Sequence, residues 1–393
     1  MAVSFALAWV LYLLFVGCLN WREHGVFETR VSLNSPHRST AVWAVAAYGF
    51  CGPAAVFVTG YAEALTIFAI ALFVLLLAQD RYLWALPVAF LAAQSRPVGV
   101  PLGALAGMWW LYCLVAEYRV RSAGQPRASS GRVFLAAFAA RAVHLLSALT
   151  VCFFAFTHAL HAAYKTGRLD AYLATELGWS GRTVEEGQHY VVQWVNELSL
   201  YLNRWSTGAI ITLIVAGFAA YFLWLFSRST RTLLHPVMLI WCVCYAVYLG
   251  IFWLPQSSTF RILLPLFPFA LVLMSYGKDS KAYRWLLVLS GVLMQLVWVG
   301  WLWHSHGPGD MQLKYSVFPA PPARAAPVRP PRRSAAAACP PATRRGAAAY
   351  RQWPESRRMW GSWGRPTQWG CPHPRRCAET HPAAPNPAVA PGS

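Results

Sequence analysis

The sequence predicts an all-α fold: a polytopic bundle of about nine to ten transmembrane helices followed by a disordered C-terminal tail. Hydrophobic residues make up 57% of the chain and charged residues only 12%, too few to cover the surface of a soluble protein. Apolar runs close to the roughly 20 residues that a helix needs to cross a bilayer recur along the first three quarters of the chain. Lipid offers no hydrogen-bond partner to free backbone groups, so such runs are expected to cross as helices.

The predicted membrane domain, residues 1–304, contains ten apolar segments. They cover 2–19, 41–59, 64–79, 82–95, 97–116, 133–160, 207–227, 235–254, 262–276 and 285–303. The weakest is 82–95, which is short for a full span, so a broken or re-entrant helix is an alternative interpretation for it. The number of crossings is therefore nine or ten.

Lys and Arg in short loops favour the cytoplasmic side of a membrane, and three loops of this chain carry them. They are Arg119, Arg121, Arg127 and Arg132 in one loop, Arg228 and Arg231 in the next, and Lys278, Lys281 and Arg284 in the third. The connections 161–206 and 255–261 are then extracytoplasmic. Counting back along the chain places Tyr61, Glu63 and Met1 outside as well.

An external position for Met1 is expected if a helix and its external loop are missing upstream. No basic segment precedes the first apolar run, so that run does not resemble a signal peptide. Alternatively, 82–116 forms a single span, the first part of the chain is inverted and the amino terminus lies inside. We favour the first interpretation.

Residues 305–393 form a separate tail rich in Pro, Arg and Ala. From Pro321 to Ser393 the tail holds twelve Arg, two Glu and no Lys, and it carries over half of the chain's formal charge of +19. Such a composition cannot bury a core and predicts disorder. The abrupt loss of Lys, Ile and Leu is also what translation of a GC-rich gene in a shifted frame would produce.

Polar residues gather at the predicted external ends of three apolar segments. They are Tyr61 with Glu63, Gln94 with Arg96, and Gln256 with Arg261. Charged groups at such depth are costly and usually face a cavity or a partner. Two arginines and an acid on one side of the membrane would suit an anionic lipid headgroup, since Arg binds phosphate through two parallel hydrogen bonds. The alternative is that the arginines extend to the interface and one of them pairs with Glu63.

The external segment 161–206 mixes charged and aromatic side chains, among them Asp170, Glu176 and Trp179. Sugars stack on aromatic rings and need hydrogen-bond partners for their hydroxyls, so this composition suits a carbohydrate. The alternative is an amphipathic interfacial helix whose Trp and Tyr lie at headgroup level. The sequence contains no Gly-rich phosphate loop and no acidic pair for the metal of a nucleotide-sugar, so a transferase would need a lipid-borne donor.

Several short motifs resemble the glycosylphosphatidylinositol mannosyltransferase II (PIG-V) family in its actinobacterial form. They are Pro-x-x-x-Phe followed by Tyr-x-Glu (Pro53, Phe57, Tyr61 and Glu63), Arg-Pro-x-Gly (Arg96 to Gly99), "TGRLDAYLATELGW" and "LPQSSTFRILLPLFPF". Their order and spacing, over about 41–276, carry the resemblance.

The resemblance implies a GT-C glycosyltransferase in the bacterial plasma membrane, which takes mannose from a polyprenyl-phosphate carrier on the extracytoplasmic face. Its acceptor would be a lipid or a glycan, and no nucleic acid partner is expected. Arg96 and Arg261 would bind the donor phosphate, so neither a metal nor a cofactor is expected. The substrate-binding residues would be Tyr61, Glu63, Gln256, Asp170, Glu176 and Trp179.

One departure from the family leaves the catalytic base unassigned. The family's catalytic acid lies in a first external loop near a Trp-Asp pair, and no such loop is found here, so a truncated chain is expected to be inactive. A transporter or flippase for lipid-linked sugars would share an anionic pocket and an aromatic loop, although no internal repeat is visible. A non-catalytic membrane partner in envelope assembly is the third interpretation.

Overall fold

The computed structural model describes most of the first 302 residues. The described residues are 1–30, 36–59, 61–123, 130–179, 195, 198–199, 202, 205–252, 259–277 and 279–302. By its internal contacts the chain divides into two units, Met1–Val328 and Arg329–Ser393, and all described residues belong to the first. The predicted tail, 305–393, and the candidate site residue Gln256 lie outside the described residues.

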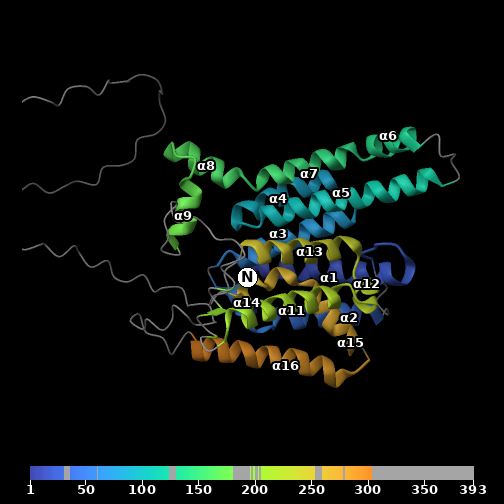
Figure 1. Cartoon of the computed structure of the whole chain (residues 1–393). Coiled ribbons are helices and arrows are strands. Elements are labelled where there is room, and N and C mark those ends of the chain that lie inside the picture. The colour runs from blue at the N-terminus through green and yellow to red at the C-terminus, as the bar shows by residue number, and fades with distance from the viewer. Residues whose placement is uncertain are drawn as a thin grey trace, which may run out of the picture. The chain divides into compact units, whose positions relative to one another are not determined.

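Every regular element in the described part of the chain is a helix, which confirms the all-α class (Figure 1). The first half holds α1 (Ala2–His24), α2 (Pro36–Gly49), η1 (Gly52–Val58), α3 (Glu63–Ala78), α4 (Tyr82–Ser95), α5 (Gly99–Ser122), α6 (Ser130–Ala140), α7 (Ala142–Phe154), α8 (Thr157–Thr166) and α9 (Ala171–Trp179). The second half holds α11 (Thr207–Leu225), α12 (Arg228–Leu233), α13 (Pro236–Phe252), α14 (Thr259–Ile262), η3 (Leu264–Leu266), α15 (Pro268–Tyr276), α16 (Lys281–Val297) and η4 (Trp298–Leu302).

Four helices of the described chain are long and apolar enough to cross a membrane: α1, α5, α11 and α16 with its extension to Gly300. Two bent pairs raise the number to six, α2 with η1 at 82° and α6 with α7 at 57°. Helices α3, α4 and α13 are apolar but shorter. The predicted number of nine to ten crossings is therefore not confirmed, because several predicted segments are short or broken.

The breaks have local causes. Pro53 is the second residue of η1. In the segment predicted as 262–276, Pro265 is the second residue of η3 and Pro268 is the first residue of α15. Proline lacks the N–H that continues a helix and sets a fixed φ, so it favours the first turn of a new element. The sequence interval 262–276 thus contains three short elements instead of one helix.

The core lies around α3, which packs against α1, α4 and α13. The side chains of α3 are apolar on nearly every face of the helix, and a helix of this kind is usually buried. By contrast, α16 exposes a stripe of leucines along one face. These are Leu286, Leu289, Leu293 and Leu296, each more than half exposed. Exposed apolar helices around a buried apolar centre are compatible with a membrane protein.

Helices α4 and α5 form a hairpin. The indole Nε1–H of Trp109 donates to the Tyr82 hydroxyl at 3.0 Å, although a continuous helix would place these residues about 40 Å apart. The chain reverses at Arg96, whose backbone is extended because Pro97 follows it. One continuous helix over 82–116 is therefore excluded, whereas the number of crossings in this interval stays a prediction, because α5 alone is long and apolar enough for a candidate span.

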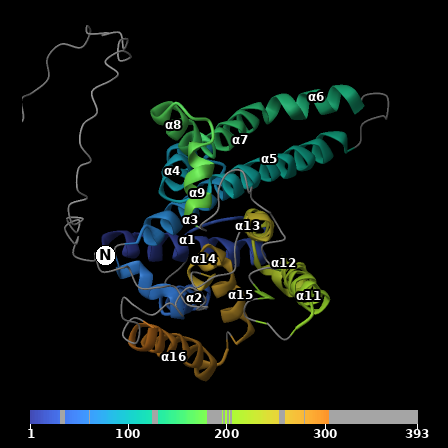
Figure 2. The ribbon, with the colours of Figure 1, turned by 60° about the vertical axis from the view of Figure 1, so that its left-hand side comes forward.

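Two glycines bring α5 against α7, which lies alongside it in both views (Figures 1 and 2). A Cβ on Gly99 would lie 2.6 Å from the Cα of Ala155, and one on Gly103 would lie 3.0 Å from the Sγ of Cys152. Small residues four apart permit this close approach of helices in a membrane. The contact holds the turn after Arg96 in place.

We expect Gly99→Ala to destabilise the protein by about 1–3 kcal/mol, because the added methyl group meets backbone atoms of α7 that cannot move independently. Gly107→Ala is the matched control, since no atom lies within 4 Å of its added Cβ. Thermal unfolding of the detergent-solubilised variants measures the difference. Equal melting temperatures for the two variants would contradict the close contact.

Candidate functional site

The ends of several helices bring together four of the predicted site residues. Glu63 is the first residue of α3, and Tyr61 lies two residues before it. Arg96 follows the last residue of α4, and Arg261 lies in the short helix α14. In Figure 1, α14 lies toward the same end of the long helices as α8 and α9, whereas α6 and α12 lie toward the other end.

One carboxylate oxygen joins the two arginines. Glu63 Oε1 accepts a hydrogen bond from Arg96 Nη2 at 2.5 Å and lies 3.0 Å from Arg261 Nε. The side chains are 8% exposed for Glu63, 16% for Arg261 and 35% for Arg96, so only Arg96 has substantial access to the surface. The Arg261 guanidinium carbon lies 4.8 Å from the centre of the Tyr61 ring. We call these four residues the Glu63 cluster.

The local charge of the Glu63 cluster is positive. Two guanidinium groups face one carboxylate, so the sum of the formal charges is +1. The first turn of α3 adds the partial positive charge of a helix N-terminus, which also favours the carboxylate at position 63. A partly buried site with excess positive charge suits an anion that can accept hydrogen bonds from guanidinium groups.

Two polar atoms of the cluster are buried without a hydrogen bond in the part of the chain that the structure describes. They are Glu63 Oε2 and Arg261 Nε, the latter paired with Glu63 by distance alone. Buried polar groups are normally hydrogen-bonded, so each exception calls for an explanation, such as a catalytic role or a bound ion. The cluster thus retains hydrogen-bonding capacity in a largely desolvated place.

Beside each arginine, one tyrosine of α13 donates a hydrogen bond to a backbone carbonyl. The sequence did not identify either tyrosine as a site residue. The Tyr245 hydroxyl donates to the Ile262 carbonyl at 2.6 Å, and the Tyr248 hydroxyl donates to the Pro97 carbonyl at 2.8 Å. Residues three apart share a face of a helix. The signal that could have found them is this spacing of two hydroxyls in an otherwise apolar helix.

The external segment reaches the neighbourhood of the Glu63 cluster through α9. Burial and a hydrogen bond with Glu176 raise the pKa of Tyr172 to about 12. Tyr172 and Glu176 both interact electrostatically with Tyr248, the tyrosine that contacts the Pro97 carbonyl. Helix α9 is thereby placed beside the end of α13.

Of the remaining predicted site residues, Asp170 has a partner of its own outside the cluster. Asp170 lies in the turn before α9 and pairs with Arg168 at 2.8 Å; this exposed guanidinium lowers the pKa of the Asp170 carboxyl. Trp179 is the last residue of α9, and its side chain, like all of Gln256, is outside what the structure describes. Among the described residues, no group of three or more His, Cys, Asp or Glu is placed to hold a metal ion.

A second acid with two arginines provides a comparison at the opposite end of α5. Glu117 pairs with Arg121 at 2.7 Å and with Arg141 at 2.9 Å. All three side chains are at least 22% exposed, and Glu117 lies on the last turns of α5, away from the start of α3. The Glu63 cluster therefore differs in burial and in its aromatic neighbour.

No family model, curated protein or solved structure matches this chain. The described part of the chain defines the class as all-helical, with four to six candidate membrane spans among its described residues. Any more specific assignment rests on the Glu63 cluster and on the motifs in which its residues occur.

We expect Glu63→Gln to destabilise the protein by about 3 kcal/mol, because it leaves the mostly buried Arg261 guanidinium without a counter-charge. The matched control is Glu117→Gln. Water can solvate the arginines that lose this partner, so we expect the stability to fall by about 1 kcal/mol or less. Unfolding in detergent measures both changes. A loss for Glu117→Gln as large as for Glu63→Gln would show that burial does not distinguish the two clusters.

Proposed function

We propose that this protein is a membrane-embedded glycosyltransferase of the GT-C type, which moves mannose from a polyprenyl-phosphate donor to a lipid or glycan acceptor. The observation that carries the proposal is the sharing of the buried Glu63 carboxylate by Arg96 and Arg261. These three residues belong to three separate motifs that resemble the PIG-V family. Their convergence at one place supports a common site.

The arginines would bind the donor phosphate. In the proposed reaction the acceptor hydroxyl oxygen bonds to the anomeric carbon of mannose, and the bond from that carbon to the phosphate oxygen breaks. Its electron pair leaves with the lipid phosphate, whose growing charge Arg96 and Arg261 stabilise. The hydroxyl proton passes to a general base, a role to which no residue of this chain is assigned.

Glu63 is proposed as a positioning residue. Its Oε1 atom lies within 3.0 Å of both guanidinium groups and would keep them close enough for one anion to contact both. Tyr61 covers the Arg261 guanidinium and limits its access to water. Helix α9, with Tyr172 and Glu176, supplies aromatic and polar side chains near the same end of the fold for contact with a sugar.

We also propose the finer topology that the charged loops predict. The short helices α3, α4 and α13 cross the bacterial plasma membrane together with the longer ones, giving nine or ten membrane segments. The end that carries the Glu63 cluster and α9 is extracytoplasmic, and the last turn of α5, with Arg119 and Arg121, is cytoplasmic.

Arg261→Ala is expected to weaken the binding of polyprenyl-phosphate mannose about 10- to 150-fold, because it removes a charge-assisted hydrogen bond worth about 1.5–3 kcal/mol. Arg261→Lys is expected to recover only part of this loss, since an ammonium keeps the charge but not the two parallel N–H groups. Titration of the detergent-solubilised chain with the donor, followed by native mass spectrometry, measures the affinities.

Arg121→Ala is the matched control, because it removes an arginine from the Glu117 cluster at the other end of α5. Equal donor affinities for Arg261→Ala and Arg121→Ala would assign Arg261 a structural role and refute the site. If the protein binds the donor and moves it between the leaflets of a vesicle without transferring its mannose, the result would favour a transporter instead.

The proposed orientation is testable with two exposed positions. In a protein whose native cysteines are replaced, Leu169→Cys, at a position 93% exposed, is expected to react with a membrane-impermeant thiol reagent added to intact cells. Val120→Cys, at a position 75% exposed in the last turns of α5, is expected to react only after lysis. Labelling of Val120→Cys in intact cells would overturn the orientation.

A further inference from the structure

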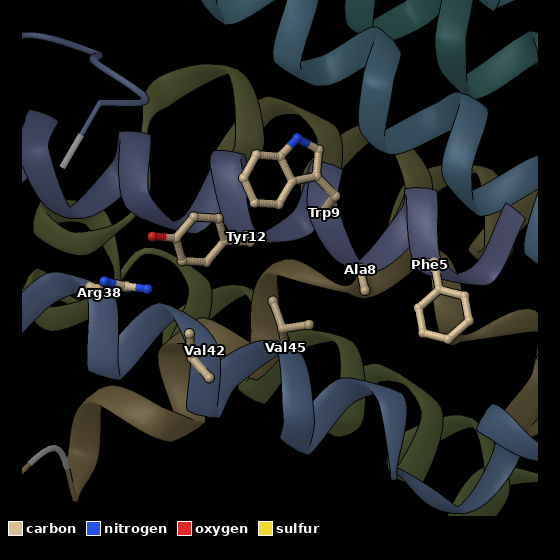
Figure 3. A pocket seen from close by; sticks show the side chains of 7 residues that line it. All are labelled: Phe5, Ala8, Trp9, Tyr12, Arg38, Val42 and Val45. Carbon is tan, nitrogen blue, oxygen red and sulfur yellow. The ribbon is translucent and has the colours of Figure 1, made fainter. Parts of the chain in front are cut away.

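A groove with a volume of about 530 Å³ runs between α1 and α2 (Figure 3). Its lining consists of Phe5, Ala8, Trp9 and Tyr12 from α1 and of Arg38, Val42 and Val45 from α2. In Figure 3 the arginine lies toward the Tyr12 end of the groove, and Phe5 lies at the other. The groove is thus apolar along most of its length and basic at one end.

The apolar walls follow the axes of the two helices. Phe5, Trp9 and Tyr12 recur at helical spacing on one face of α1, and from Phe5 to Tyr12 this strip is about 10 Å long. Phe5 is 75% exposed and Trp9 is 61% exposed. Beside Phe5, Ser4 Oγ donates to the Phe57 carbonyl at 3.0 Å, which joins α1 to η1 at this end.

Arg38 is exposed in the first turn of α2, and its guanidinium has no hydrogen bond or ion pair with another residue in the described part of the chain. Its neighbours leave the region basic. Arg284 donates to Ser39 Oγ at 3.0 Å, while the nearby acid Glu23 is already bonded to His37. An unpaired guanidinium at the end of an apolar strip complements a molecule with an apolar chain and an anionic head.

We propose that this groove binds one phospholipid with an anionic headgroup, whose phosphate contacts Arg38 and whose acyl chain lies between α1 and α2. Arg38 lies at the start of α2, and the Glu63 cluster follows the other end of α2 and η1, so the two sites are separate. The predicted orientation puts Tyr61 outside, so Arg38, at the opposite end of α2 and η1, lies on the cytoplasmic side, where anionic lipids attract basic side chains. The proposal does not depend on the glycosyltransferase assignment.

The headgroup contact is tested with phosphatidylglycerol and phosphatidylcholine of identical acyl chains, added to the full chain in mixed micelles and counted by native mass spectrometry. Arg38→Gln is expected to lower the affinity for phosphatidylglycerol about fivefold, the contribution of one arginine near a lipid surface, and to leave that for phosphatidylcholine unchanged. Arg119→Gln is the control, because Arg119 is also exposed, in the last turn of a helix that leads away from the groove.

The acyl-chain contact is tested by filling the groove. Val42→Phe is expected to reduce the retention of both lipids, whereas Val143→Phe, at an exposed valine on α7, is expected to change neither. The proposal is overturned if Arg38→Gln and Arg119→Gln behave alike, or if Val42→Phe retains lipid like the parent. A change from one oligomeric state to another in Val42→Phe would identify the groove as an interface between copies and would also overturn it.

Discussion

A carboxylate that leaves water loses its hydration and needs opposite charge and hydrogen-bond donors in return, and Glu63 finds both in two arginines. This interaction connects the start of α3, the turn between α4 and α5, and the short helix α14. Those elements are far apart in the sequence. Because the acid is nearly buried, separating either arginine from it would leave a charge in an apolar place.

The surrounding contacts restrict the positions of the two arginines that bind Glu63. Tyr245 and Tyr248 fix the carbonyls next to Arg261 and Arg96, so α13 limits how far each guanidinium can move. The close contact between Gly99 and Ala155 holds the turn after Arg96 against α7. A preorganised pair of cations costs little reorganisation when an anion binds, which is the property that phosphoryl-linked donors require of a site.

The comparison with Glu117 shows that residue composition alone does not determine the environment of an ion cluster. Both clusters contain one acid and two arginines, and both close a contact between neighbouring helices. The Glu117 carboxylate is 22% exposed, against 8% for Glu63, so water screens its ion pairs more strongly and they contribute less. The Glu63 cluster is shielded by the Tyr61 ring, so the same groups interact more strongly.

The sequence by itself determined the all-α class, because apolar runs and proline breaks act over a few residues; Pro97, for example, ends α4 by forcing Arg96 into an extended conformation. The sequence also indicated that Tyr61, Glu63, Arg96 and Arg261 belong to one side of the molecule. Only the tertiary structure decided that one carboxylate oxygen meets both arginines, that α4 and α5 form a hairpin, and that several expected spans are short or bent. The reason for the first two is that they depend on how separate helices pack, and the distance between residues such as 63 and 261 is not encoded in any local pattern. The short and bent spans have local proline causes, but the tertiary structure shows where each break falls.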